Sequence, residues 1–179
     1  MWKWNRRDPF LEKAYYHIFN RWYNKTIIFK NDHCFENFYK YLFRYLKEFK
    51  WDIKISSYCF LPNHFHLVIQ NLDGTGTQLS KFMKKLQGAY SVWFRVKYPL
   101  EDILGTGTQM RLPVFEWRFK AKIIDNEDYL EKCLAYVNFN ALKHEIVDNI
   151  DNYKWTSYHQ LDKVKLEKYK DLSLDELEF

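Results

Sequence analysis

The chain has 179 residues, which is enough for one domain with a substantial core. Hydrophobic residues make up 47% and aromatic residues 20%, as is typical of a globular protein, and the formal net charge of +5 favours an anionic partner without identifying it. Three scattered cysteines without a CxxC pair argue against a disulfide framework and indicate a reducing compartment. Because neither a signal peptide nor a membrane-spanning apolar run is present, we expect a cytoplasmic protein without a membrane partner.

The first two predicted elements are a strand and a helix. Residues 14–22 are aromatic and β-branched, which predicts a strand. Residues 32–49 have apolar side chains at three- and four-residue spacing, which predicts a helix with Asp32 as its N-cap. The apolar positions of this helix are Phe35, Phe38, Leu42, Tyr45, Leu46 and Phe49.

Two strands and a second helix follow. Residues 51–61 and 64–70 are predicted strands, separated by Pro62 and Asn63 as turn residues. A helix is predicted to begin near Ser80, with one apolar and one basic face. We expect Leu79, Phe82, Met83 and Leu86 to face inward and Lys81, Lys84, Lys85 and Arg95 to face outward.

The last two elements complete an alternating pattern. Residues 114–124 predict a strand, and residues 126–147 predict a helix that is acidic at its start and basic toward its end. The order strand, helix, strand, strand, helix, strand, helix predicts an α+β protein of ferredoxin-like type, in which helices pack on one face of an antiparallel sheet. The sequence GTGTQ occurs at 74–78 and again at 105–109, and both copies are interpreted as loops.

A pair of histidines interrupts the strand at 64–70. Because side chains alternate along a strand, His64 and His66 point to the same face while Phe65 points into the core. Two imidazoles on one face can share a metal ion, which could polarise a phosphoryl oxygen. A hydrogen-bonded or exposed pair without a metal is the alternative, and the motif alone does not decide between them.

The stretch LPNHFHLVI resembles the His-hydrophobic-His strand of the single-tyrosine transposases of the HUH class, in particular the REP-associated tyrosine transposases of the insertion-sequence 200 type. The resemblance covers roughly residues 14–160 in the family's order. It includes the segments YYHIFNRWYNKTIIFKND, LSKFMKKLQGAYSVWFRVKY, VFEWRFKAKIIDNEDYLEKCLAYVNFNALKHEIV and YKWTSYHQL. We therefore expect a transposase domain at 14–160, preceded by a basic aromatic arm at 1–13 and followed by a charged extension at 161–179.

The resemblance implies an activity and its residues. Such enzymes cleave and rejoin single-stranded, hairpin-bearing DNA through a 5′-phosphotyrosine, with a divalent metal, Mg²⁺ or Mn²⁺. The family's metal-binding histidines correspond to His64 and His66, and its nucleophile to Tyr136 in YVNFNA. Asn140, one helical turn later, would complete the metal shell. Ala141 stands where the family usually has proline, so the helix is expected to continue further before turning.

Basic residues provide candidates for DNA binding. Arg118 and Lys120 precede the predicted catalytic helix and match a basic element of the family. Lys81, Lys84 and Lys85 would serve the same purpose, and solvated faces are the alternative in each case. In the N-terminal arm, Trp2, Trp4, Arg6 and Arg7 suit the binding of unpaired bases, although disorder explains them equally well.

Two other functions remain open from the sequence. A domesticated or inactive module that binds a DNA or RNA hairpin would have the same basic and aromatic character. A replication initiator or relaxase would use the same chemistry but usually carries further domains. Relatives include dimers in which the tyrosine serves the neighbour's metal site, so monomer and homodimer both remain open. The other histidines, His17, His33, His144 and His159, are interpreted as structural.

Overall fold

The computed structural model describes residues 9–23, 27–98, 113–116 and 118–171. Its elements run β1 (Tyr15–Arg21), α1 (Asp32–Glu48), β2 (Ile53–Leu61), β3 (His64–Asn71), α2 (Gln78–Lys97), β4 (Lys120–Ile124), α4 (Glu127–Asn138), α5 (Asn140–Lys143), η2 (Ile150–Asn152), η3 (Tyr158–Gln160) and α6 (Lys163–Glu167). The aromatic and basic residues of the predicted arm (Trp2, Trp4, Arg6 and Arg7), the second GTGTQ copy and the last eight residues lie outside the described ranges.

The four strands form one antiparallel sheet in the order β2-β3-β1-β4. β1 is central, and its register places Phe19 opposite both His66 of β3 and Lys120 of β4. The predicted strand at 114–124 is shorter than expected, because only Lys120–Ile124 pairs continuously with β1. Upstream of β4, Phe115 forms only an isolated bridge with Trp22, so this part is not a strand.

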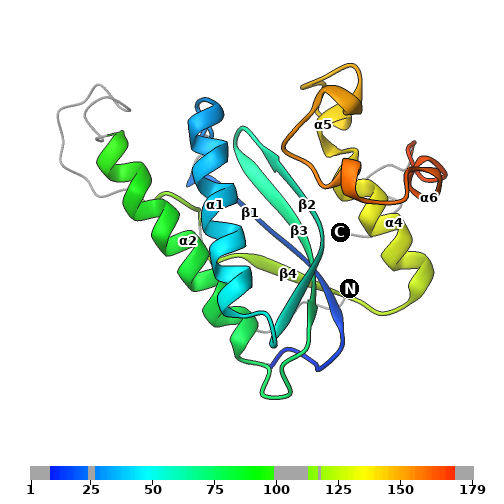
Figure 1. The fold of residues 1–179 in the computed structure, drawn as a ribbon, viewed down its shortest axis with the longest axis horizontal. Coiled ribbons are helices and arrows are strands. Elements are labelled where there is room, and N and C mark those ends of the chain that lie inside the picture. The colour runs from blue at the N-terminus through cyan, green and yellow to red at the C-terminus, as the bar shows by residue number, and fades with distance from the viewer. Residues whose placement is uncertain (1–8, 24–26, 99–112, 117, 172–179) are drawn as a thin grey trace.

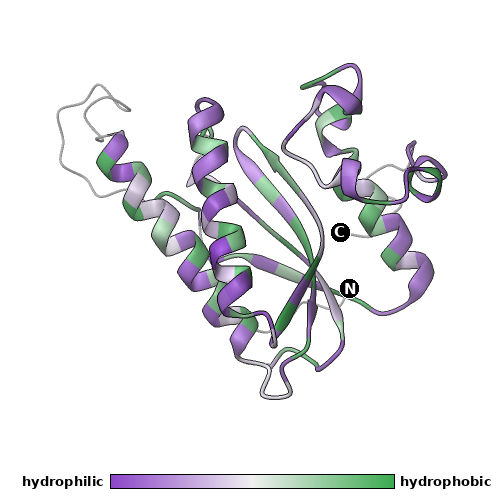
Figure 2. Cartoon of the chain, in the orientation of Figure 1, coloured by the Kyte–Doolittle hydropathy of each residue, from purple (hydrophilic) through white to green (hydrophobic). Residues whose placement is uncertain are grey.

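Two of the three predicted helices cover one face of the sheet, whereas the third, at 126–147, lies on the other face. α1 and α2 pack against each other on one side, and α4, α5 and α6 lie on the other (Figure 1). Both α1 and α2 carry hydrophobic and hydrophilic bands (Figure 2). The predicted inward residues of α2 (Leu79, Phe82, Met83 and Leu86) are fully buried. The antiparallel α+β fold is therefore confirmed, with α4 as an additional layer over β2 and β3.

Strand alternation divides the sheet into two chemically different faces. Phe65, Leu67 and Ile69 of β3 are fully buried, and Phe65 packs against Phe38 of α1. The alternate residues His64, His66 and Val68 point to the opposite face, on the side of α4. The hydrophobic core beneath α1 and α2 thus fixes the face on which the two histidines lie.

The start of α1 differs from the prediction. Asn31, not Asp32, is the N-cap, and its side-chain oxygen accepts a hydrogen bond from the Cys34 amide at 3.2 Å. Asp32 is the first helical residue and its carboxylate binds Lys154. Both residue types are common N-caps, and an acidic residue in the first turn is also favourable, so composition alone does not separate the two positions.

The predicted helix at 126–147 is divided in two. α4 ends at Asn138 and α5 begins at Asn140, with Phe139 between them at ψ 6°. The buried Asn138 side chain donates hydrogen bonds to Ser57 on β2 and to the Leu134 carbonyl, both at 2.8 Å. We attribute the break to these two hydrogen bonds. The bond to Ser57 holds Asn138 against the sheet, and the bond to the Leu134 carbonyl competes with regular helix geometry. Helical structure does continue past Ala141 to Lys143, as expected, but only after this break at Phe139.

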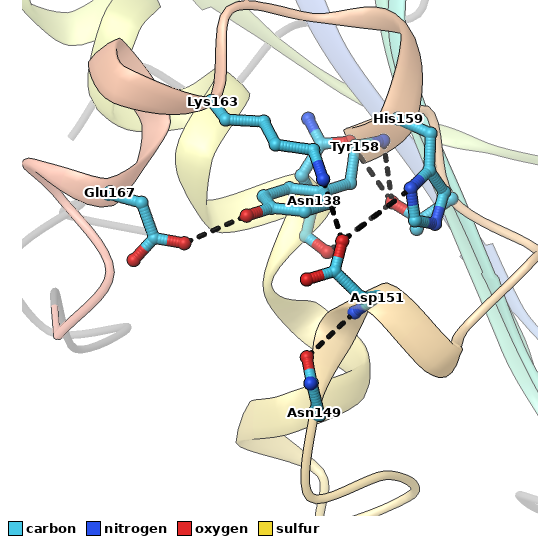
Figure 3. Close-up of polar contacts among 8 residues, drawn as sticks. Asn138, Asn149, Asp151, Tyr158, His159, Lys163 and Glu167 are labelled. Atoms are coloured by element: carbon cyan, nitrogen blue, oxygen red, sulfur yellow. Dashed lines mark hydrogen bonds and ion pairs between the residues drawn. The ribbon is translucent and has the colours of Figure 1, made fainter.

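Segments outside residues 14–160 also contribute to the core. Phe10 is buried and packs edge-to-face on Tyr16, and Leu166 of α6 is buried as well. Figure 3 shows the C-terminal region, where the Tyr158 hydroxyl donates to Glu167 at 2.8 Å. In the same region Asp151 accepts a hydrogen bond from Lys163 at 2.6 Å. These contacts hold α6 against the rest of the domain.

The first GTGTQ copy forms a tight loop that begins α2. Asp73 accepts hydrogen bonds from the amides of Thr75, Thr77 and Gln78 at 2.9–3.0 Å. Burial alone would raise the pKa of the Asp73 carboxyl, but these bonds outweigh it and lower the pKa to about 2. Gly76 has φ +66° and lies under the Phe10 backbone, where a side chain would not fit. The loop therefore requires an ionised Asp73.

We expect Asp73→Asn to lower the free energy of unfolding by about 1–2 kcal/mol at pH 7, because the new amide group faces backbone donors. The native pKa is depressed, so the stabilisation is complete above the unfolded-state pKa of about 3.9 and disappears as the pH falls through about 2. Urea denaturation between pH 7 and pH 2 measures the difference. The exposed Asp148→Asn serves as the control, and equal losses in both variants would contradict the prediction.

Candidate active site

β3 brings the two predicted metal-binding histidines together. The ring centroids of His64 and His66 are 5.1 Å apart, and the rings are nearly perpendicular. His66 is buried, with 6% of its surface exposed, while His64 is partly exposed. Their common face follows from strand alternation, because Phe65 between them points into the opposite core.

α4 places Tyr136 beside these histidines within the same chain. The Tyr136 ring lies edge-to-face against His66 at 5.7 Å and against His17 at 6.0 Å between centroids. Its exposed fraction is only 3%. The Lys143 ammonium group lies 4.9 Å from the centre of the Tyr136 ring, so a positive charge is next to the phenol. Tyr129, on the same helix, instead has the Lys122 ammonium group 5.2 Å from the centre of its ring.

Asn140 adds an amide group to the cluster. Its Nδ2 donates to the Tyr136 carbonyl at 3.3 Å, whereas its Oδ1 is buried and has no hydrogen-bond partner. A buried acceptor without a partner is costly, and coordination of a cation would satisfy it. Within the described ranges, no group of three or more His, Cys, Asp and Glu residues is arranged to hold a metal ion. A site here would therefore combine two imidazoles with an amide oxygen, a mixed nitrogen and oxygen donor set that fits a divalent metal ion.

Burial keeps the histidines neutral. Burial lowers the pKa of His64 to about 4, with smaller contributions from His144 and Arg21. Burial also lowers the pKa of His66 well below its usual value, and that of His17 to about 3. Neutral imidazoles have a nitrogen lone pair available, which a metal ligand requires.

The Tyr136 phenol is neutral for a similar reason. Burial raises its pKa, and a hydrogen bond with the Asn140 side chain acts in the opposite direction. A neutral phenol is a weak nucleophile at pH 7. Reaction at this oxygen therefore requires a well-positioned electrophile with its charge partly neutralised.

Several residues near the cluster were missed by the sequence analysis. His17 Nε2 hydrogen-bonds to His66 Nδ1 at 2.8 Å, and the His144 ring is 5.0 Å from that of His64. Arg21, opposite His64 in the β1–β3 register, forms an ion pair with Glu116. The interpretation of His17 and His144 as merely structural did not anticipate these contacts. A four-residue spacing from Asn140 could have indicated His144, whereas the other two depend on strand register.

The predicted DNA-binding residues fall on two sides of the sheet. Lys120, on β4, lies 5.8 Å from the Phe19 ring, which in turn stacks near His66. Arg118 is exposed just before β4. The three predicted lysines of α2 (Lys81, Lys84 and Lys85) line a groove between α1 and α2, on the other side of the sheet from α4. Lys85 forms an ion pair there with Glu48.

A buried polar network holds α4 in place. The Asn138 amide donates to Ser57 on β2, and its oxygen accepts from Thr156 at 3.0 Å and Ser157 at 2.8 Å. Asn138 and its three partners are all buried. Tyr136 and Asn140 flank Asn138 at two residues on either side, so the network determines where both of them lie.

Comparison with known proteins identifies the family. A family model described as "Transposase IS200 like" matches residues 10–140, a span that includes the histidine pair, Tyr136 and Asn140. The chain belongs to the IS200-like transposase family. No curated protein matches the sequence of this transposase.

One solved structure has the same fold as this transposase, and two others are less similar. A REP-associated tyrosine transposase bound to a REP hairpin is similar with a TM-score of 0.65 at 13% identity, covering 89% of this chain and 84% of the other. A protein from Deinococcus radiodurans assigned as a transposase gives 0.46 at 14% identity, with 84% and 98% covered. The tRNA(His) guanylyltransferase of Saccharomyces cerevisiae gives 0.42 at 14% identity, with 97% and 78% covered. The last two scores are too low to support an argument.

Within the described part of this transposase, no helix is long and apolar enough to cross a membrane.

We expect Asn138→Ala to destabilise the transposase by about 2–3 kcal/mol, because three buried hydroxyl groups each lose one hydrogen bond. Urea denaturation at pH 7 measures this loss. Asn152→Ala, at an exposed position, is the control and should change stability by less than about 0.5 kcal/mol. Equal stability of the two variants would show that the network does not hold α4.

Proposed function

We propose that this transposase cleaves and rejoins single-stranded, hairpin-bearing DNA through a phosphotyrosine at Tyr136. In this proposal His64, His66 and Asn140 hold a divalent metal, Mg²⁺ or Mn²⁺. One observation carries the proposal: the Tyr136 ring lies against the His66 ring of the same chain, beside the unpartnered Asn140 Oδ1. A module that only binds DNA has no need for a tyrosine, two neutral histidines and a free amide oxygen in one cluster.

The proposed reaction is a transesterification. The metal, when bound, supplies positive charge to the phosphoryl oxygens of the scissile phosphate. The Tyr136 oxygen attacks the phosphorus and loses its proton as the new P–O bond forms. The bond to the 3′ oxygen breaks, and that oxygen gains a proton to leave a free 3′-OH. Because the phosphotyrosine is itself a phosphodiester, attack by another 3′-OH reverses the step and rejoins DNA without a nucleotide cofactor.

The charges around Tyr136 support a role in binding phosphate. Lys143 lies over the phenol ring, and Lys120 reaches the same face of the sheet through its contact with Phe19. We assign Lys120 and Arg118 to the DNA backbone next to the scissile phosphate. The lysines at 81, 84 and 85 are assigned to a part of the DNA remote from the cleavage point, because they face the other side of the molecule. Binding should therefore weaken steeply with salt.

Hairpin DNA is the proposed substrate for two reasons. The relative with a TM-score of 0.65 was solved with a REP hairpin, and the chain covers most of that protein. In addition, 20% of this chain is aromatic, and aromatic side chains stack on unpaired bases. The adjacent single strand would then enter the cluster at Tyr136.

The direct test is a covalent adduct. We expect the wild-type chain to form one with labelled hairpin DNA from the flanks of its own gene in the presence of Mn²⁺. Tyr136→Phe removes only the hydroxyl, so the adduct should disappear while folding and hairpin binding persist. Tyr129→Phe is the matched control on the same helix and should retain the adduct, because Tyr129 lies about 10 Å further along the helix axis.

Two outcomes would contradict the proposal. An adduct that persists in Tyr136→Phe, mapped by mass spectrometry to another tyrosine, would refute the assignment of the nucleophile. A wild-type chain that binds its hairpin but never forms an adduct would favour the alternative of a hairpin-binding module.

A further inference from the structure

We infer that Asn63 and His17 are positioning residues, which orient the two metal-binding histidines so that both present Nε2 to the metal. The inference rests on the proposed metal site and extends it to residues that do not touch the metal. Each of the two histidines has its Nδ1 engaged by a different side chain. The contact with Asn63 determines which nitrogen of His64 carries the proton, and the contact with His17 allows the same tautomer at His66.

Asn63 determines the tautomer of His64. The Asn63 Oδ1 is 2.6 Å from His64 Nδ1. An amide oxygen only accepts hydrogen bonds, so Nδ1 carries the proton. The lone pair of the neutral ring then lies on Nε2, which is the atom left for a metal.

His17 has the corresponding role for His66. Its Nε2 is 2.8 Å from His66 Nδ1, and the two rings are within 15° of parallel with centroids 5.0 Å apart. The 2.8 Å between the two nitrogens accounts for much of the 5.0 Å between the ring centroids. The rings therefore lie edge to edge rather than face to face. One proton is shared between two nitrogens, and a metal at His66 Nε2 requires that this proton be on His66 Nδ1. His17 is then the acceptor.

The fold holds both positioning residues on rigid backbone. Asn63 is in the turn between β2 and β3, and its carbonyl accepts a hydrogen bond from the Trp22 amide at 3.0 Å. His17 is in the central strand β1 and is 1% exposed. Neither side chain is free to drift, so the His64 and His66 rings are oriented before a metal binds. Loss of such outer contacts typically weakens metal binding 10–100-fold.

The experiment measures Mn²⁺ affinity of the full chain without DNA, by calorimetry or by electron paramagnetic resonance of free Mn²⁺. We expect Asn63→Ala and His17→Leu each to weaken binding by about 10–100-fold. Asn63→Asp and His17→Gln keep an acceptor and should restore most of the affinity. His33→Leu and Asn37→Ala are matched controls, since this pair also forms hydrogen bonds but lies on α1.

Nitrogen-15 NMR of the histidine rings gives a readout that general destabilisation would not change. In the wild type without metal we expect His64 to be protonated at Nδ1, and in Asn63→Ala we expect its proton to move to Nε2. Asn63 lies in a turn and is only partly buried, so this variant tests the inference even if His17→Leu does not fold.

The outcomes separate this inference from the proposed function. If the wild type binds Mn²⁺ through His64 and His66 but folded Asn63→Ala and His17→Leu bind it equally well, the positioning role is refuted and the metal site stands. If His64→Ala binds Mn²⁺ as tightly as the wild type, the metal site itself is refuted, and the positioning role with it.

Discussion

The buried amide of Asn138 is the interaction on which the geometry of the site depends. It connects α4 to β2 and to the 156–157 segment, and it uses both its donor and its acceptor groups in doing so. A network of this kind is stabilising only when every member has a partner, so it specifies one position for α4. Tyr136 lies two residues before Asn138 and Asn140 two residues after it. Consequently, the nucleophile candidate and the amide oxygen are both set against the histidines of their own chain.

The sheet separates the aromatic core under α1 and α2 from the layer that contains the histidines and Tyr136. Phe65 anchors β3 in the aromatic core under α1 and α2, and the residues on either side of it point the other way. The histidines are therefore fixed by the same packing that stabilises the fold. On their side of the sheet, burial lowers the pKa of both rings, and the cations Lys120 and Lys143 lie nearby. Neutral imidazoles beside positive charge are what the proposed metal and phosphate site would need.

The parts of this arrangement that depend on local pattern could be predicted from the sequence. Strand alternation gave the common face of His64 and His66, and the family motif indicated Tyr136. The contacts of His17 with His66 could not be predicted, because they depend on the register between β1 and β3, which no local pattern specifies. The division of the helix predicted at 126–147 into α4 and α5 depends on the Asn138 side chain, which hydrogen-bonds to Ser57 on β2, 81 residues earlier in the chain. Helical periodicity contains no information about such a long-range hydrogen bond.

In the proposed site, one chain supplies both the tyrosine and the histidine pair. The most direct measurement mixes a Tyr136→Phe chain with a His64→Ala/His66→Ala chain and tests the mixture for a covalent adduct with hairpin DNA and Mn²⁺. Because α4 is tied to its own sheet, we predict that neither variant nor the mixture forms an adduct, while the wild type does. An adduct in the mixture would contradict the account, since it would require Tyr136 of one chain to serve the histidines of another.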